Sequence, residues 1–93
     1  MTNKVVHNPD EQRYEILVDG ILAGFTEAKE GDDGIVVFPH TEIFEQFDGQ
    51  GLASQLVGGA LDDVRVRGLK VRPVCAYVVR WIDKHQDYAD LVA

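Results

Sequence analysis

The sequence predicts a single small α/β domain of the α+β kind, in which an antiparallel meander is followed by a helix, a strand and a second helix. Up to residue 43 the chain consists of short segments separated by turn residues. These segments are either apolar throughout or alternate between apolar and polar residues, which is the pattern of strands. After Gly49 the apolar residues recur at helical spacing instead. With 93 residues the chain has room for one domain, expected over residues 1–93, and for a thin hydrophobic core.

The first strands are predicted around two tight turns. An extended segment begins at residues 5–6 and turns at residues 8–10, and apolar residues then alternate in a largely period-two pattern over residues 14–18. Asp19-Gly20 is a pair favoured in two-residue hairpins, because glycine accepts the positive φ that such a turn requires. A returning strand is therefore expected over residues 21–28.

Another turn and a bent strand complete the predicted meander. Residues 30–34 are rich in glycine and aspartate, and residues 35–38 are β-branched or aromatic, as strand residues commonly are. The strand is expected to continue through residues 40–43. Pro39 has no amide to donate, so the pairing must be interrupted there or face an edge.

A helix, a short strand and a second helix are predicted next. The first helix ends near Gly68, a residue suited to a helix C-terminus, and its apolar stripe contains Leu52, Leu56, Val57, Ala60, Leu61 and Val64. Residues 69–74 predict a strand and residues 77–85 a second helix. Residues 86–92 form a short tail that is expected to pack back.

Composition and charge narrow the range of partners. A net charge of -7 argues against nucleic acid, because neutralising phosphates requires a surplus of Lys and Arg. Residues 1–48 carry three Lys or Arg against eleven Asp or Glu, whereas residues 49–93 carry six against five. An anionic ligand is therefore expected at the second half and a cationic amine at the first.

The chain is expected to be a cytoplasmic protein, either a monomer or a weak homodimer. No apolar run approaches the roughly 20 residues that a membrane-spanning helix needs, and the polar start lacks the apolar stretch of a signal peptide. Cys75 is the single cysteine, which suits a reducing compartment and excludes an internal disulfide. No metal site is expected.

The most informative segment is the glycine-rich turn between a strand and the first helix, Asp48-Gly49-Gln50-Gly51-Leu52-Ala53. Glycines let backbone amides crowd together, and the first amides of a helix lack internal partners, so they favour an anion such as phosphate. The Gly-Lys-Ser/Thr ending of a P-loop is absent, and the preceding sheet is a meander rather than a βαβ unit. Such a turn is also common as a purely structural feature.

From Asp48 to Ala53 the turn resembles motif A of the GNAT acetyltransferases, Arg/Gln-x-x-Gly-x-Gly/Ala, with Gly51 and Ala53 in the two small positions. Nearly the whole chain is similar to the small stand-alone N-acetyltransferase domain-containing type of this superfamily. The segments that carry this similarity are 40–42, 47–53, 71–75 and 85–92. The resemblance implies a minimal GNAT (acyl-CoA N-acyltransferase) fold, acetyl-CoA as cofactor and an amine as acceptor.

Asp48 departs from the motif, because relatives usually have Arg or Gln there and a carboxylate cannot donate to a phosphate. The pyrophosphate would then depend on the amides of residues 50–53 and on nearby cations. An alternative register matches residues 46–51, which restores Gln46 but moves the helix start two residues earlier. The first register agrees better with the apolar stripe of the helix. The candidate cations are Arg72, Arg80 and Lys84.

The resemblance further implies a cleft between two splaying strands, one ending at Ile43 and one around Val71. The free backbone groups of residues 41–43 would pair with the amides of the pantetheine arm as a pseudo-strand. The thioester would lie between Ile43 and Cys75. The implied cofactor-binding residues are Thr41, Ile43, Asp48, Gly49, Gln50, Gly51, Leu52 and Ala53.

Acetyl transfer needs a neutral amine, a donor for the developing oxyanion and a proton for the departing thiolate. Glu42 is the first candidate base, directly or through water, and His40 is the second because imidazole titrates near neutral pH. Cys75 would protonate the thiolate or take the acetyl group itself as a nucleophile. Tyr77 is another candidate proton donor, and packing or surface roles stay open for all four side chains.

Two other functions stay open at this point. A CoA-binding or regulatory module without turnover fits the Asp48 departure and the missing early helices of larger acetyltransferases. An interaction protein whose acidic meander engages a basic partner fits the uneven charge.

Overall fold

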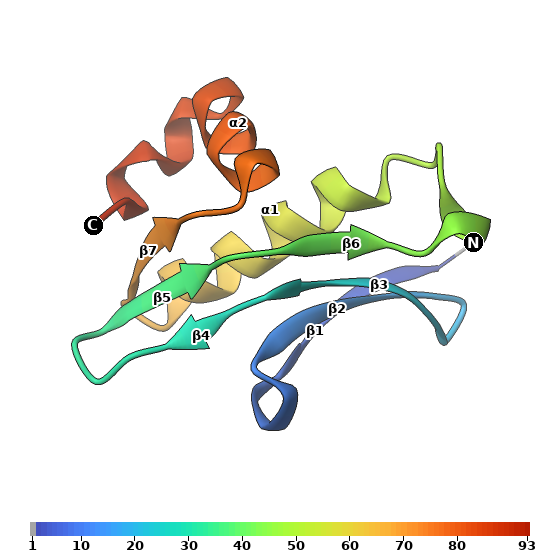
Figure 1. Ribbon diagram of the computed structural model, residues 1–93, viewed down its shortest axis with the longest axis horizontal. Coiled ribbons are helices and arrows are strands. Elements are labelled where there is room, and N and C mark those ends of the chain that lie inside the picture. Colours follow the sequence, from blue (N-terminus) through green and yellow to red (C-terminus); the bar gives the residue numbers. More distant parts are fainter. Residues whose placement is uncertain (1) are drawn as a thin grey trace.

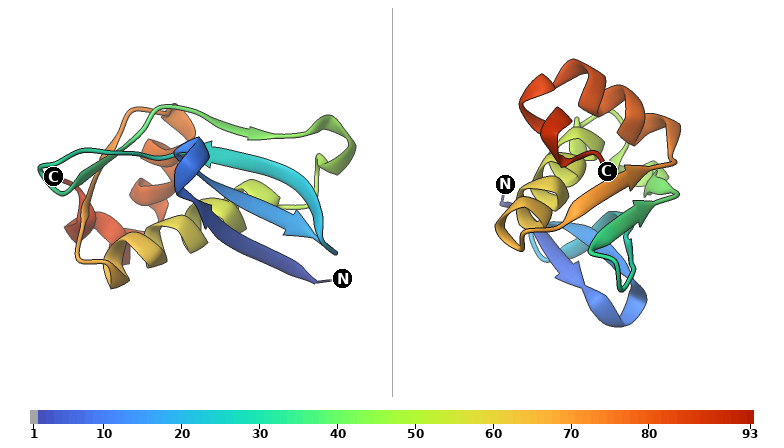
Figure 2. Two further views of the ribbon diagram at one scale, coloured as in Figure 1. Left: turned by 90° about the horizontal axis from the view of Figure 1, so that it is seen from below. Right: turned by 90° about the vertical axis from the view of Figure 1, so that its left-hand side faces the viewer.

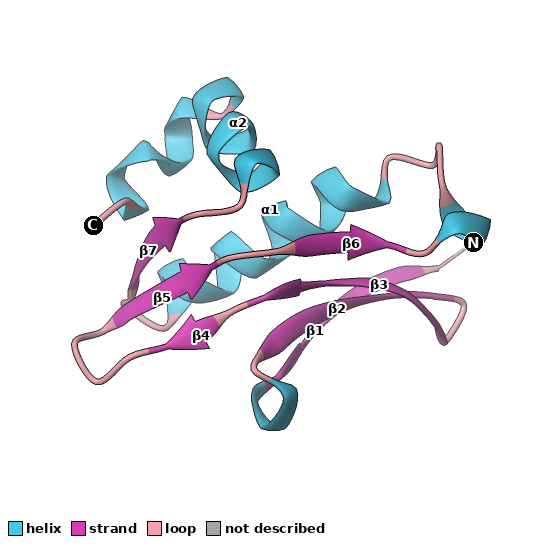
Figure 3. Ribbon diagram, viewed as in Figure 1, coloured by secondary structure: helices cyan, strands magenta, loops and turns pink. Residues whose placement is uncertain are grey.

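The computed structural model describes residues 2–93 and contains two small sheets and two helices (Figures 1 and 3). Met1, with which the predicted polar start begins, lies outside the described residues. The strands are β1 (Asn3–Asn8), β2 (Arg13–Val18), β3 (Ile21–Glu27), β4 (Lys29–Glu30), β5 (Ile35–Phe38), β6 (Thr41–Ile43) and β7 (Lys70–Pro73). The helices are α1 (Leu52–Val66) and α2 (Ala76–Lys84), and 3₁₀ turns cover Pro9–Glu11, Glu45–Phe47 and Gln86–Leu91. The predicted α+β class is confirmed.

The first sheet has the strand order β1-β2-β3-β6, and all of its pairs are antiparallel. The hairpin between β2 and β3 turns at Asp19 and Gly20, whose φ angles are 51° and 84°. Two successive positive φ values are the conformation that a two-residue hairpin favours. The predicted hairpin is therefore confirmed.

The second sheet has the order β4-β5-β7, with β5 antiparallel to β4 and parallel to β7. The sequence predicted one bent strand over residues 35–43. The structure has two strands instead, β5 and β6, which follow one another in line but belong to different sheets (Figure 1). The pairing is interrupted at Pro39, as predicted, because proline cannot donate to a ladder.

Helix α1 packs against strands of both sheets and against α2 (Figure 2). All six residues of the predicted apolar stripe are buried, and they contribute to one core with inward-facing residues of β2. The core residues of β2 are Tyr14, Ile16 and Val18. The period of the stripe therefore predicted both the helix and the face that it buries.

Helix α2 and the tail complete the core. The Trp81 indole donates from Nε1 to Ser54 Oγ at 2.9 Å, which joins α2 to the first turn of α1. Leu91 in the tail is buried, and the Ala93 amide donates to the Val71 carbonyl at 2.9 Å. The tail thus packs back along β7, as predicted.

Candidate functional site

The two sheets separate where β5 and β7 stop pairing. Their parallel ladder ends at Phe38 and Pro73, and the Phe38 carbonyl accepts from the amides of Val74 at 3.1 Å and Cys75 at 2.8 Å. Beyond this point the chain after β7 turns into α2, whereas the chain after β5 continues as β6 beside β3 (Figure 1). The predicted splay is therefore located at Phe38.

One edge of β6 is turned away from β3. The His40 carbonyl accepts from the Glu27 amide of β3 at 2.8 Å. The Phe44 amide donates to the Ala23 carbonyl of β3 at 2.9 Å. Backbone groups alternate between the two edges of a strand, so those of Thr41 and Ile43 face the opening. Glu42 pairs with β3, so the expectation that its backbone is also free was wrong.

The turn before α1 presents unpaired amides to the same region. Gly49 and Gly51 have φ values of 79° and 71°, and the helix begins at Leu52 as the preferred register predicted. Within residues 2–93 no side-chain oxygen caps this helix, and the Gln55 amide makes a backbone bond of 3.5 Å to the Gly51 carbonyl. The first amides of α1 are therefore available to an anion.

A hollow of about 150 Å³ lies at this turn. It brings together the predicted cofactor-binding residues except Thr41. Its lining consists of Ile43, Phe47, Asp48, Gly49, Gln50, Gly51, Leu52, Ala53, Ser54 and Tyr77. The exposed Asp48 carboxylate belongs to the same rim, so amides and one negative charge share the hollow.

An adjoining hollow of about 230 Å³ shares Ser54 and Tyr77 with the first. Its other lining residues are Arg80, Trp81, Lys84 and His85. The sequence had indicated Arg80 and Lys84 as candidate cations, whereas Arg72 lines neither hollow. The rings of Trp81 and His85 stack with centroids 3.8 Å apart, and this aromatic surface was missed. Its signal was the spacing of four residues between two aromatic rings on one helix.

Cys75 lies at the start of α2, half-buried beside Thr41. Its thiol donates to Thr41 Oγ1 at 3.6 Å, and that hydroxyl is bonded to Thr26 Oγ1 at 2.8 Å. Burial by itself raises the pKa of the thiol, but the amides of Val78, Tyr77 and Thr41 and the Thr41 hydroxyl outweigh it. The pKa of Cys75 therefore lies below its ordinary value, which favours the nucleophilic thiolate.

His40 and Glu42 form a separate, exposed pair. Their side chains approach to 3.3 Å between Nε2 and Oε1, and each is about half exposed, at 52% and 49%. Side chains alternate across a strand, so this pair and the Thr41 side chain lie on opposite faces of the sheet. The structure therefore groups the predicted catalytic residues as Cys75 with Thr41 and as His40 with Glu42.

Two further observations concern metals and membranes. Over residues 2–93, no three His, Cys, Asp or Glu side chains cluster closely enough to hold a metal ion. Neither helix of this part of the chain is long and apolar enough to cross a membrane.

Comparisons with solved structures agree with this fold. An NMR structure of a GCN5-like protein from Staphylococcus aureus, provisionally assigned as an N-acetyltransferase, has a TM-score of 0.71 at 18% identity. The alignment covers 97% of this chain and 87% of that chain.

Two larger proteins share part of the fold. The ribosomal-protein-alanine N-acetyltransferase of Brucella melitensis biovar Abortus 2308 has a TM-score of 0.56 at 21% identity, covering 87% of this chain and 60% of that chain. A Bacillus anthracis protein provisionally assigned as a streptothricin acetyltransferase, crystallised with acetyl coenzyme A, has a TM-score of 0.53 at 13% identity. That match covers 66% of this chain and 36% of that chain. At such low identities the likeness establishes the fold alone.

The sequence comparison identifies the family. No curated protein matches the chain. A family model described as GCN5-related N-acetyl-transferase matches residues 13–91, which is most of the chain. The chain therefore belongs to the GCN5-related N-acetyltransferase (GNAT) family.

Proposed function

We propose that this protein is an acetyl-CoA-dependent N-acetyltransferase that acts on a small-molecule or peptide amine. Members of its family typically use acetyl-CoA. The observation that carries the proposal is that unpaired backbone groups at the start of α1 meet the open edge of β6 at one hollow, which Ile43 of that edge lines. A diphosphate attached to an amide-bearing arm has the chemistry that both sets would bind.

The turn and the adjoining hollow would hold the nucleotide half of the cofactor. The amides of residues 50–53 would donate to the diphosphate at the positive end of the α1 dipole. Arg80 and Lys84 would attract the remaining phosphate charge, which compensates for the carboxylate at Asp48. The Trp81 and His85 rings offer an aromatic surface beside these cations.

The open edge of β6 would hold the pantetheine arm. Amides of the arm would pair with the backbone groups of Thr41 and Ile43, in the manner of an added strand. The arm would then run along β6 toward the point where the sheets separate. This direction brings the thioester next to Cys75, which contacts Thr41.

Two routes of acetyl transfer fit this placement. In the direct route, the amine nitrogen would attack the thioester carbonyl. Glu42, with His40 as the second candidate base, would take the amine proton through water, because both side chains lie on the face of the sheet opposite Thr41 and Cys75. The C–S bond then breaks, and the CoA thiolate takes a proton from the Cys75 thiol or the Tyr77 hydroxyl. In the covalent route, the Cys75 thiolate would attack the thioester carbonyl first and release CoA thiolate. The amine would then attack the acetyl-cysteine carbonyl, the C–S bond to Cys75 would break to regenerate its thiolate, and the amine proton would pass to the released CoA thiolate or to water. Against the opposing effect of burial, hydrogen bonds to the Cys75 thiol lower its pKa, and this direction favours the covalent route.

A CoA-binding module without turnover is the second candidate function. The Asp48 carboxylate on the rim of the hollow favours it, because this departure from the acetyltransferase motif lies within the proposed cofactor site. Calorimetry with acetyl-CoA and an assay of thiol release with a mixed amine library separate the two functions. Binding with thiol release supports the transferase, and binding alone supports the module.

Matched lysine variants test the proposed position of the nucleotide. Lys84→Gln is expected to weaken acetyl-CoA binding by about threefold to tenfold, because a charge-assisted contact to phosphate is lost. Lys29→Gln changes the net charge equally but lies on β4, outside both hollows, and is expected to leave binding unchanged. Equal effects of the two variants would contradict the proposed position.

A further inference from the structure

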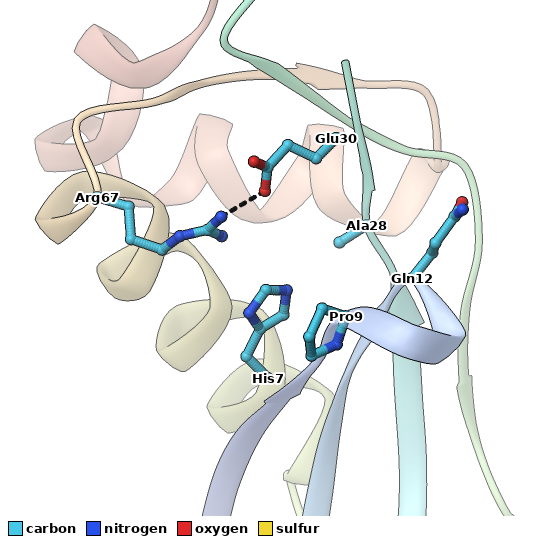
Figure 4. Close-up of a pocket in the computed structure, with 6 residues that line it drawn as sticks. All are labelled: His7, Pro9, Gln12, Ala28, Glu30 and Arg67. Atoms are coloured by element: carbon cyan, nitrogen blue, oxygen red, sulfur yellow. Dashed lines mark hydrogen bonds and ion pairs between the residues drawn. The ribbon is translucent and has the colours of Figure 1, made fainter. Parts of the chain in front are cut away.

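A third hollow, which we term the distal pocket, lies at the far end of α1 (Figure 4). Its volume is about 280 Å³, and it is lined by His7, Pro9, Gln12, Ala28, Glu30 and Arg67. Since an α-helix rises by about 1.5 Å per residue, Arg67 lies roughly 22 Å along the axis from Leu52. None of the lining residues borders the candidate active site. The distal pocket is therefore a separate site, and its interpretation does not rest on the proposed function.

A hydrogen-bonded network fixes one wall of the distal pocket. Tyr14 is 1% exposed, and its hydroxyl donates to Asp63 Oδ2 at 2.6 Å and accepts from Arg67 Nη1 at 3.3 Å. Arg67 also pairs with Glu30 through Nη2 and lies 3.7 Å from Asp63. Burial and the Asp63 carboxylate raise the pKa of Tyr14, so its hydroxyl keeps its proton. The guanidinium is thus held by partners on β2, β4 and α1.

The distal pocket also has polar atoms that the network leaves free. The His7 ring stacks on Tyr14 at a centroid distance of 4.5 Å, and no side chain or backbone group of residues 2–93 hydrogen-bonds to its nitrogens. Arg67 has five N–H donors, of which the network uses only part. Glu30 accepts from Arg67 through Oε1, which leaves Oε2 free to accept from a ligand. Figure 4 shows these three side chains directed toward one common space.

The charges around this space indicate what it would bind. A simple anion would meet Arg67 already flanked by two carboxylates, those of Glu30 and Asp63. A simple cation would pair with Glu30 but leave the donors of Arg67 unused. A molecule with adjacent carboxylate and ammonium groups satisfies both, because its carboxylate reaches Arg67 and His7 while its ammonium reaches Glu30.

We infer that the distal pocket binds a zwitterionic α-amino acid with a small or apolar side chain. The volume of about 280 Å³ equals that of about nine water molecules, which leaves ample room for such a ligand. Ala28 is buried and Pro9 is exposed, and both line the pocket. These two residues offer an apolar surface to the ligand's side chain.

NMR titration of the full chain with L-alanine tests this inference. Saturable shifts are expected at the His7 ring and at the Arg67 side chain. Sodium acetate and methylammonium chloride at equal ionic strength are each expected to bind about tenfold or more weakly, because each lacks one of the two charged contacts. Absence of a saturable His7 shift with L-alanine, or equal binding of acetate, would overturn the inference.

Three variants make the test specific. Arg67→Gln is expected to weaken L-alanine binding at least about tenfold. Arg65→Gln is the matched control, because Arg65 is hydrogen-bonded to Asp90 outside the distal pocket. This substitution is expected to leave L-alanine binding unchanged. Glu30→Gln provides a second test of L-alanine binding if the Arg67→Gln variant does not fold. The Glu30→Gln substitution is expected to weaken the binding of L-alanine and to strengthen the binding of acetate. Weaker binding of both ligands would contradict the inference.

Discussion

Cys75 should deprotonate at a lower pH than a cysteine in water, where the thiol has a pKa of about 8.5. Hydrogen-bond donors around the thiol outweigh its burial and lower its pKa. Because the thiolate is the reactive form, alkylation by iodoacetamide is expected to accelerate at a lower pH in the folded protein than in the same protein unfolded in urea. The measurement is the midpoint of the rate against pH in the two states.

Variants of Thr41 test the cause of this shift. Thr41→Val removes the hydroxyl that the Cys75 thiol contacts and should move the midpoint upward. Thr41→Ser keeps a hydroxyl and should leave the midpoint near that of the parent protein. A folded-state midpoint at or above the unfolded one would refute the proposed environment of Cys75.

The environment of Cys75 could be predicted only in part. A cysteine directly after a short strand predicted a position beside the cleft. Its contact with Thr41, which lies 34 residues earlier, depends on the pairing of β5 with β7. The same limit applies to Arg67, whose partner Glu30 lies 37 residues away. A local sequence pattern does not specify such long-range partners.

At the scale of elements, the position of β6 depends on a close approach to β3 at Gly24. A Cβ atom on Gly24 would lie 2.4 Å from the Glu42 carbonyl oxygen and 2.9 Å from the Ile43 Cα. Such distances are far below van der Waals contact, so β6 would have to move. Glycine at this position therefore permits the register that turns Thr41 and Ile43 toward the opening.

Gly24→Ala is expected to lower the free energy of unfolding by about 1–3 kcal/mol, the usual cost of overpacking. Amide hydrogen exchange in β6 should also accelerate, because its ladder to β3 is strained. Urea unfolding and exchange measurements check both expectations.

Gly58→Ala is the matched control for this substitution. Gly58 lies within α1, where alanine is favoured over glycine by about 1 kcal/mol, and its Cβ would meet only the edge of the Trp81 ring at 3.2 Å. Its effect on stability is therefore expected to be small. Equal destabilisation by the two variants would mean that the β3–β6 approach has no special role.

The individual helices and strands could be predicted better than the pairing of the strands into sheets. The six-residue apolar stripe predicted α1 and its buried face, and Asp19-Gly20 predicted a hairpin. The division of residues 35–43 between two sheets could not be predicted beyond the interruption at Pro39. It depends on β7, which arrives from beyond α1 to pair with β5. Strand propensity is local, whereas sheet membership is decided by tertiary packing.

At the scale of the whole molecule, α1 connects the two regions to which ligands are proposed to bind. Its N-terminus borders the hollow at the glycine turn, and the residue after its last turn, Arg67, lines the distal pocket. The sequence identified the first region, because glycines before an apolar stripe mark the start of a helix. It did not identify the second, because His7, Glu30 and Arg67 come together only in the fold.

The central claim is that the unpaired amides at the start of α1 receive the diphosphate of acetyl-CoA while its arm lies along the open edge of β6. Backbone NMR during titration with acetyl-CoA tests it most directly. The account predicts saturable shifts at the amides of residues 50–53 and of Thr41 and Ile43, with the amides of Asp10 and Glu11 in the first 3₁₀ turn unmoved. Amides of residues 50–53 that stay in place at saturating acetyl-CoA would contradict the claim.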